Sequence, residues 1–131
     1  MRQKKKHELL TEVELEFMNK LWALGEGTVR EVLDQLPQDR NLAYTSGATI
    51  LRILEQKEFV TSRKDGKRHV FIPALAKGAY QTRSLKDLSM RLFDDTPASL
   101  VARLVDDAEL TEEVLGQIRA LVDRRLKNDS G

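Results

Sequence analysis

The sequence predicts a mainly α-helical fold with one small β-hairpin, followed by a further helical region. Apolar residues recur at helical spacing through most of the 131 residues. Between residues 59 and 72, two runs rich in aromatic and β-branched residues instead flank an Asp-Gly pair, which is typical of two strands joined by a turn. Glycine, proline and threonine separate these segments, so each helix has a recognisable start or stop.

Two helices are expected before residue 37. The first begins after Thr11, whose hydroxyl can cap it, and ends at Gly25. The Thr28 and Glu31 pair is a capping-box pattern, so a second short helix is expected to start there and to stop before Pro37. The apolar stripe of the first helix consists of Leu10, Val13, Phe17, Leu21 and Leu24.

The segment YTSGATILRIL, residues 44–54, predicts a third helix with two different sides. At 3.6 residues per turn, one side carries Gly47, Ile50, Leu51 and Leu54, and the other carries Thr45, Thr49, Arg52 and Gln56. Small hydroxyls and an arginine can approach phosphates and base edges in a major groove. The alternative is an ordinary amphipathic helix with a polar outer side. The candidate DNA-binding residues are Tyr44, Thr45, Ser46, Thr49 and Arg52.

The predicted hairpin has a basic tip. Residues 59–61 and 70–72 favour strands, the segment from Arg63 to Arg68 has turn chemistry with Asp-Gly at its centre, and Pro73 closes the second strand. The order of three helices and a hairpin predicts a winged helix-turn-helix domain over residues 10–73. Its candidate phosphate contacts are Arg63, Lys64, Lys67 and Arg68, with a solvated turn as the alternative.

Residues 74–131 predict helices alone. The first runs from about Leu75 to Phe93, the second follows a cap at Thr96 with Pro97 in its first turn, and the last begins at Thr111. Helices this short cannot each bury an apolar stripe, so self-association as a homodimer is expected, and packing against the first domain is the alternative. The candidate dimerisation residues are Leu100, Leu104, Val114, Leu115, Ile118, Leu121 and Val122.

Composition excludes several classes of function. The formal net charge is only +1, so any affinity for nucleic acid must come from local clusters of cations. The chain has no cysteine, which excludes disulfides and thiolate metal sites. No apolar stretch is long enough for a signal peptide or a bilayer span, so a cytoplasmic protein is expected, with residues 1–9 as a flexible basic arm.

No catalytic or metal-binding constellation is recognisable. His7 and His69 lack companions at ligand spacing, so we expect no metal and no cofactor. The Asp94-Asp95 and Asp106-Asp107 pairs are interpreted as helix-end residues, because neither has a histidine or a glycine-rich loop nearby. The sequence therefore predicts a protein that is not an enzyme.

Together these segments resemble the penicillinase-repressor family of winged-helix regulators (BlaI/MecI/CopY type). LTEVELEFMNKLW, residues 10–22, is similar to that family's opening helix, YTSGATIL to its recognition helix, and the hairpin residues Gly66, Lys67, Phe71 and Pro73 to its wing. The resemblance implies a transcriptional repressor that binds an inverted-repeat operator as a homodimer, with the third helix in the major groove and the wing on phosphates. The alternative is a protein-interaction module whose winged-helix core binds no DNA.

The sequence departs from the family pattern at a few positions. Gly47 stands where the family has a β-branched residue, Ile53 where it has an arginine, and Glu58 where it has a glycine. The antibiotic-responsive branch has an Asn-Phe cleavage bond where this chain has Arg103-Leu104, and the copper-responsive branch has cysteines that this chain lacks. The resemblance therefore implies no particular inducing signal.

Overall fold

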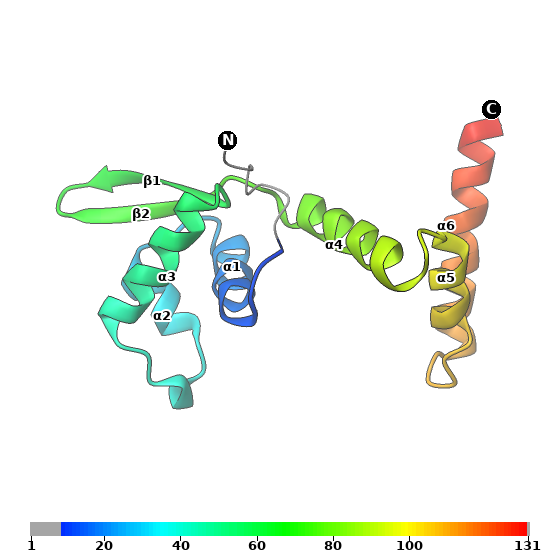
Figure 1. Cartoon of the computed structure of the whole chain (residues 1–131), viewed down its shortest axis with the longest axis horizontal. Coiled ribbons are helices and arrows are strands. Elements are labelled where there is room, and N and C mark those ends of the chain that lie inside the picture. The colour runs from blue at the N-terminus through cyan, green and yellow to red at the C-terminus, as the bar shows by residue number, and fades with distance from the viewer. Residues whose placement is uncertain (1–8, 131) are drawn as a thin grey trace. The chain divides into compact units, whose positions relative to one another are not determined.

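The computed structural model of the chain describes residues 9–130, so the expected basic arm lies, apart from Leu9, outside the described residues. Three helices are followed by a hairpin and then by three more helices (Figure 1), which confirms the predicted mainly α fold. The elements are α1 (Glu12–Leu24), α2 (Val29–Gln35), a short 3-10 turn η2 (Gln38–Arg40), α3 (Tyr44–Gln56), β1 (Val60–Asp65), β2 (Arg68–Pro73), α4 (Lys77–Leu92), α5 (Pro97–Val105) and α6 (Glu112–Ser130).

The predicted cap at Thr11 and the predicted capping box at Thr28 are both present, and the cap at Thr11 is also a full capping box. The backbone N–H of Glu14 donates to the Thr11 hydroxyl at 3.2 Å, and the Thr11 N–H donates to the Glu14 carboxylate at 3.0 Å. Thr28 and Glu31 repeat the arrangement at the start of α2. Because these bonds satisfy backbone donors that have no partner within a helix, the two starts are set by local sequence.

The hairpin is tighter than the sequence predicts. β1 pairs antiparallel with β2 from Val60 opposite Pro73 to Asp65 opposite Arg68, which leaves a two-residue loop of Gly66 and Lys67. The predicted turn from Arg63 to Arg68, centred on Asp-Gly, is therefore wrong in extent and in centre. A glycine with a φ of +67° at the first loop position reverses the chain in two residues, so the strands continue further.

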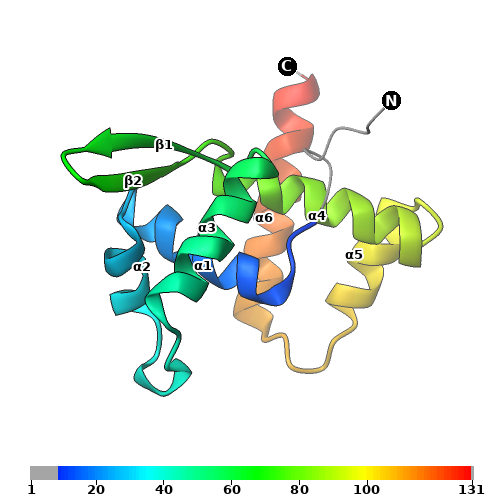
Figure 2. The same cartoon turned by 60° about the vertical axis from the view of Figure 1, so that its left-hand side comes forward.

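The wing is also attached to the helices at its other edge. Gly27, in the turn between α1 and α2, exchanges two backbone hydrogen bonds with Phe71 of β2, at 2.9 and 2.8 Å. Figures 1 and 2 both show the hairpin extending from the group of α1, α2 and α3 as a two-stranded arm. Its base is therefore held by backbone bonds on both sides of β2, whereas its tip is exposed.

The helices α1, α2 and α3 share one apolar core with the base of the hairpin. Its most completely buried side chains are Phe17, Met18, Leu21, Val32, Leu51, Leu54, Phe59 and Val60. The start of α4 belongs to this unit, because the Leu10 N–H donates to the Tyr80 hydroxyl at 2.8 Å and the Trp22 ring N–H donates to the Leu75 carbonyl at 2.9 Å.

The described residues form two compact units, which divide between residues 85 and 86. The first unit thus extends beyond residue 73, where the sequence placed the end of the winged helix, and the assignment of residues 74–131 to dimerisation remains a proposal. Within residues 86–130 no apolar side chain is fully buried. Thr96 precedes α5, but its hydroxyl bonds the Asp94 carbonyl instead of capping the helix, so that part of the prediction is wrong.

A nearly buried ion pair connects α1 to the end of α3. The Lys57 ammonium lies 2.8 and 2.9 Å from the two carboxylate oxygens of Glu14. The side chains retain only 14% and 10% of their exposure, so neither charge is well solvated. The same carboxylate completes the capping box of α1, and this pair therefore fixes where α3 ends relative to the start of α1.

α3 ends on a residue with a left-handed backbone. Glu58 has a φ of +70°, and the Phe59 N–H donates to the Leu54 carbonyl at 2.9 Å, the bond that closes a Schellman motif. Glycine is favoured at this position because a Cβ in this conformation costs roughly 1 kcal/mol or more. The left-handed backbone therefore explains why the resembled family has glycine at this position. Glu58 adopts the same backbone conformation in this chain with strain.

We expect Glu58→Gly to raise the free energy of unfolding by about 1 kcal/mol, because it relieves this strain at an exposed position. Urea unfolding measures the change. Gln56→Gly, at the last residue of α3 and at a negative φ, is the matched control and is expected to lower stability, because glycine loses more conformational freedom on folding. Equal destabilisation by both variants would contradict the explanation.

Candidate nucleic-acid interface

The polar side of α3 is open to solvent along its whole length. Tyr44, Thr45, Ser46, Thr49 and Arg52 are all exposed, whereas Gly47, Leu51 and Leu54 on the opposite side are buried. The predicted division of the helix into two sides is therefore confirmed. That the exposed residues contact DNA remains a prediction.

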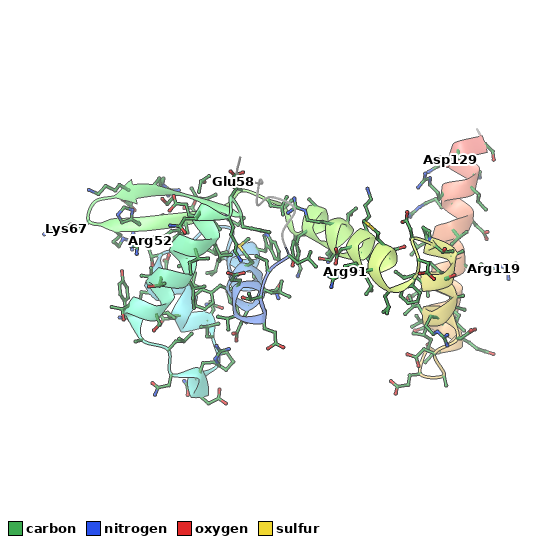
Figure 3. The ribbon with its side chains drawn as sticks, viewed as in Figure 1. Arg52, Glu58, Lys67, Arg91, Arg119 and Asp129 are labelled. Carbon is green, nitrogen blue, oxygen red and sulfur yellow. The ribbon has the colours of Figure 1, made fainter. Side chains whose placement is uncertain are left out.

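A cleft of about 480 Å³ lies between α3, the hairpin and the start of α2. Its lining is partly apolar, with Val29, Ala48 and Phe71, and partly cationic. Figure 3 shows Lys67 at the tip of the hairpin and Arg52 on α3 beside it. The cationic and imidazole side chains that line the cleft are Arg30, Arg52, Lys67, Arg68 and His69.

The four cations of the wing, Arg63, Lys64, Lys67 and Arg68, differ in where they point and in whether they have an ion-pair partner. Ser62 donates to Glu55 of α3 at 2.7 Å, so this side of β1 faces α3, and Lys64 shares it because strand side chains alternate. Arg63 points the other way and binds Glu26, while Arg68 pairs with Asp65 at 3.1 Å. Lys64 and Lys67 have no ion-pair partner within residues 9–130.

Two residues at the cleft were not among the candidates from the sequence. Arg30 of α2 lies over the Tyr44 ring, with its guanidinium carbon 5.6 Å from the ring centre. His69, which the sequence left as incidental, lines the same cleft and lies opposite Lys64 across the hairpin. No local pattern marks Arg30, since it is an exposed residue near the start of α2 and reaches the cleft only through the packing of α2 on α3.

That packing also explains Gly47. A Cβ placed on Gly47 would lie 3.1 Å from a methyl carbon of Leu33 on α2, which is closer than ordinary contact. The two helices approach each other at this point, and a glycine allows it. Gly47 lowers the intrinsic stability of the helix by about 1 kcal/mol relative to alanine. In return, it allows the close contact with α2 that positions α3.

The donor of one α3 hydroxyl is already used. Thr49 Oγ1 donates to the Thr45 carbonyl at 3.0 Å, one turn back along the helix. Because a hydroxyl has one donor and two acceptor sites, the oxygen of this exposed residue can still accept. Thr49 can thus accept a hydrogen bond or make an apolar contact, and Arg52 is the strong donor on this side.

Neither a candidate metal cluster nor a candidate membrane span occurs among the described residues. Residues 9–130 contain no group of three or more His, Asp or Glu side chains that could hold a metal ion. No helix in the same part of the chain has the length and apolar character needed to cross a membrane.

Three packed helices with a flanking hairpin and an exposed polar third helix define the winged-helix class. The chain matches the penicillinase repressor family over residues 10–124 and belongs to that family. This family consists of transcriptional repressors, so the chain is a regulator and not an enzyme.

The chain is also similar to individual proteins. An uncharacterised 16.5 kDa protein of Latilactobacillus sakei is 23% identical over 113 residues, which span 86% of this chain and 77% of that protein. The transcriptional regulator BlaI of Mycobacterium tuberculosis is 37% identical over 65 residues, 49% of this chain and 47% of that protein, so the match spans about half its length. The solution structure of the DNA-binding domain of the repressor BlaI matches with a TM-score of 0.50 at 22% identity, over 61% of this chain and 94% of that domain, a likeness in fold.

Proposed function

We propose that the chain is a cytoplasmic repressor that binds an inverted-repeat operator as a homodimer, with α3 in the major groove and the wing on phosphates. The observation that carries the proposal is the uninterrupted exposure of Tyr44, Thr45, Ser46, Thr49 and Arg52 beside a cleft lined with cations. A polar helix face of this kind can approach base edges, and the flanking cations can neutralise phosphates.

The start of α3 supports the same orientation. Ala43 provides no side-chain cap, and the first bond within the helix is from the Gly47 N–H to the Ala43 carbonyl. The N–H groups of Thr45 and Ser46 therefore lack partners within the helix, and they sit at its positive end. An anionic phosphate oxygen satisfies such donors well, so the helix start suits a contact with the DNA backbone.

Exposed apolar residues in the second unit support the homodimer. Leu104, Leu121 and Val122 are at least half exposed, while Leu100, Val114, Leu115 and Ile118 are half-buried. Val101, Val105 and Leu126 add to the exposed apolar surface. A second copy of the same surface would bury it, and two-fold symmetry would place two α3 helices in major grooves about 34 Å apart.

A salt titration tests DNA binding against the alternative of a protein-interaction module. We expect a duplex selected by the protein from a random pool to bind with a log-log salt slope of several units, because each neutralised phosphate contributes roughly 0.9. Failure to retain any duplex at low salt would contradict the proposal. The selected sequences should contain two related half-sites, and a single unpaired site would contradict the symmetric dimer.

We expect Arg52→Ala to weaken binding to the selected operator by about 1–3 kcal/mol and to relax the preference at one base pair, because an arginine can grip a guanine edge with two hydrogen bonds. Arg52→Lys is the matched control, since it keeps the charge but loses the planar fork. It should retain affinity for random duplex while losing the same base preference. Uniform weakening on every sequence would instead identify Arg52 as a backbone contact.

A further inference from the structure

One wing arginine is already engaged by an acid. Arg63 Nη1 and Nη2 donate to Glu26 Oε1 and Oε2, each at 2.8 Å, which is the bidentate geometry of the strongest arginine–carboxylate pairs. Both side chains are about half exposed, at 50% and 46%. The pair therefore lies on the surface, at a place where a phosphate could also compete for the guanidinium.

The fold places the two partners together. Glu26 directly precedes Gly27, whose backbone is bonded to Phe71 on β2, and Arg63 is on the neighbouring strand β1. Arg63 lies opposite Val70 and projects to the side of the hairpin away from Ser62, which contacts α3. The acid is thus held by backbone bonds within reach of the arginine, and the pair does not depend on a chance encounter of two mobile side chains.

Both partners are charged at neutral pH. The hydrogen bond from Arg63 is the main cause that lowers the pKa of Glu26, and the same bond raises the pKa of Arg63. An ion pair with one charge of each sign has no net charge. It therefore releases no counterion when it approaches DNA, unlike Lys64 and Lys67, for which the described residues provide no ion-pair partner.

We infer that Glu26 is a positioning residue that withholds Arg63 from DNA phosphates and so limits the wing's sequence-independent attraction to DNA. This inference rests on the proposed function. It reassigns one of the four phosphate contacts expected from the sequence: Lys64 and Lys67 attract the backbone, while Arg63 braces the wing against the turn between α1 and α2.

The test uses the full chain and a random-sequence duplex, so the operator need not be known. Glu26→Gln should free Arg63 and steepen the log-log salt slope by about 0.9, which corresponds to an additional fall of roughly threefold in affinity between 50 and 200 mM salt. Glu26→Gln combined with Arg63→Gln should return the slope to that of the wild type. Asp34→Asn, which removes an exposed acid on α2, controls for the loss of a negative charge alone and should leave the slope unchanged.

The inference is overturned if the double variant binds with a slope about 0.9 below that of the wild type, because Arg63 would then contact phosphate despite Glu26. It is also overturned if Glu26→Gln leaves the slope unchanged, or if Asp34→Asn steepens it equally. If the wild-type chain shows no salt-dependent binding to any duplex, the proposed function fails and the inference fails with it. This result differs from the others, in which the wild type binds and only the inference fails. Matching urea midpoints across the variants exclude a loss of folding as the cause.

Discussion

Leu121→Lys is expected to convert the proposed dimer to monomers and to lower operator affinity by roughly 10²–10⁴-fold, because two linked half-site contacts become independent. Leu121 is 54% exposed on α6 and belongs to the apolar stripe that a second copy would cover. A buried ammonium without a partner is costly, so the dimer interface cannot accept the lysine in place. Sedimentation measures the assembly, and a duplex titration measures the affinity.

Ala120→Lys provides the matched control. Ala120 is exposed and lies two residues from both Ile118 and Val122, so at about 100° per residue it projects from the opposite side of α6. This variant introduces the same charge at the neighbouring position. We expect it to remain dimeric and to bind the operator as tightly as the wild type. Dissociation by both variants, or by neither, would contradict an interface built on the apolar stripe of α6.

Lys57→Met is expected to destabilise the first unit by about 3 kcal/mol at pH 7, because it leaves the carboxylate of Glu14 buried without its cation. Urea unfolding at constant protein concentration measures this change. Lys64→Met is the control, since Lys64 is exposed and has no ion pair within residues 9–130, and its effect should stay within about 0.5 kcal/mol.

The pH dependence of this effect has a definite sign. In the wild type, burial raises the pKa of Glu14, but the hydrogen bonds and charge of Lys57 together with the Thr11 bonds outweigh it, so the net pKa lies below the ordinary 4.5. A carboxyl whose pKa is lowered on folding stabilises the protein above its unfolded pKa, and this contribution is lost as the pH falls through the folded pKa. The wild type should therefore lose stability from this group below about pH 4.5.

In Lys57→Met, the charge and the hydrogen bonds of Lys57 no longer lower the pKa of Glu14, whereas burial still raises it. The stability difference between wild type and Lys57→Met should therefore be largest at neutral pH and shrink as acid neutralises Glu14. Adding Glu14→Gln to Lys57→Met should recover most of the loss at pH 7, because glutamine removes the unpaired charge and can still complete the capping box. A loss that stays constant between pH 7 and pH 3, or that Glu14→Gln does not reduce, would show that the charge of Glu14 is not the cause.

Local sequence was sufficient to predict those features whose interacting residues all lie within one short segment. The cap at Thr11, the capping box at Thr28, the two sides of α3 and the helix–helix–helix–hairpin order were all predictable, because each depends on residues a few positions apart. The sequence predicted a reversal between the two strands, but its extent and its centre were both wrong. Residue composition marks a turn, whereas the paired strands decide how closely it closes.

Contacts between distant segments could not be predicted in the same way. Arg30 reaches Tyr44, and Glu26 reaches Arg63, across loops whose lengths reveal nothing about the final distances. The extension of the first unit into α4 depends equally on Tyr80 and Trp22 finding partners far away in the chain.

The sequence alone thus determined that this protein is a set of short capped helices with a basic hairpin, since periodicity and capping act within a turn or two of the chain. The tertiary structure decided which of the basic residues have an acidic partner. That outcome is set by the distance between side chains on different elements, because an arginine and a carboxylate form a pair without net charge only where the fold brings them together.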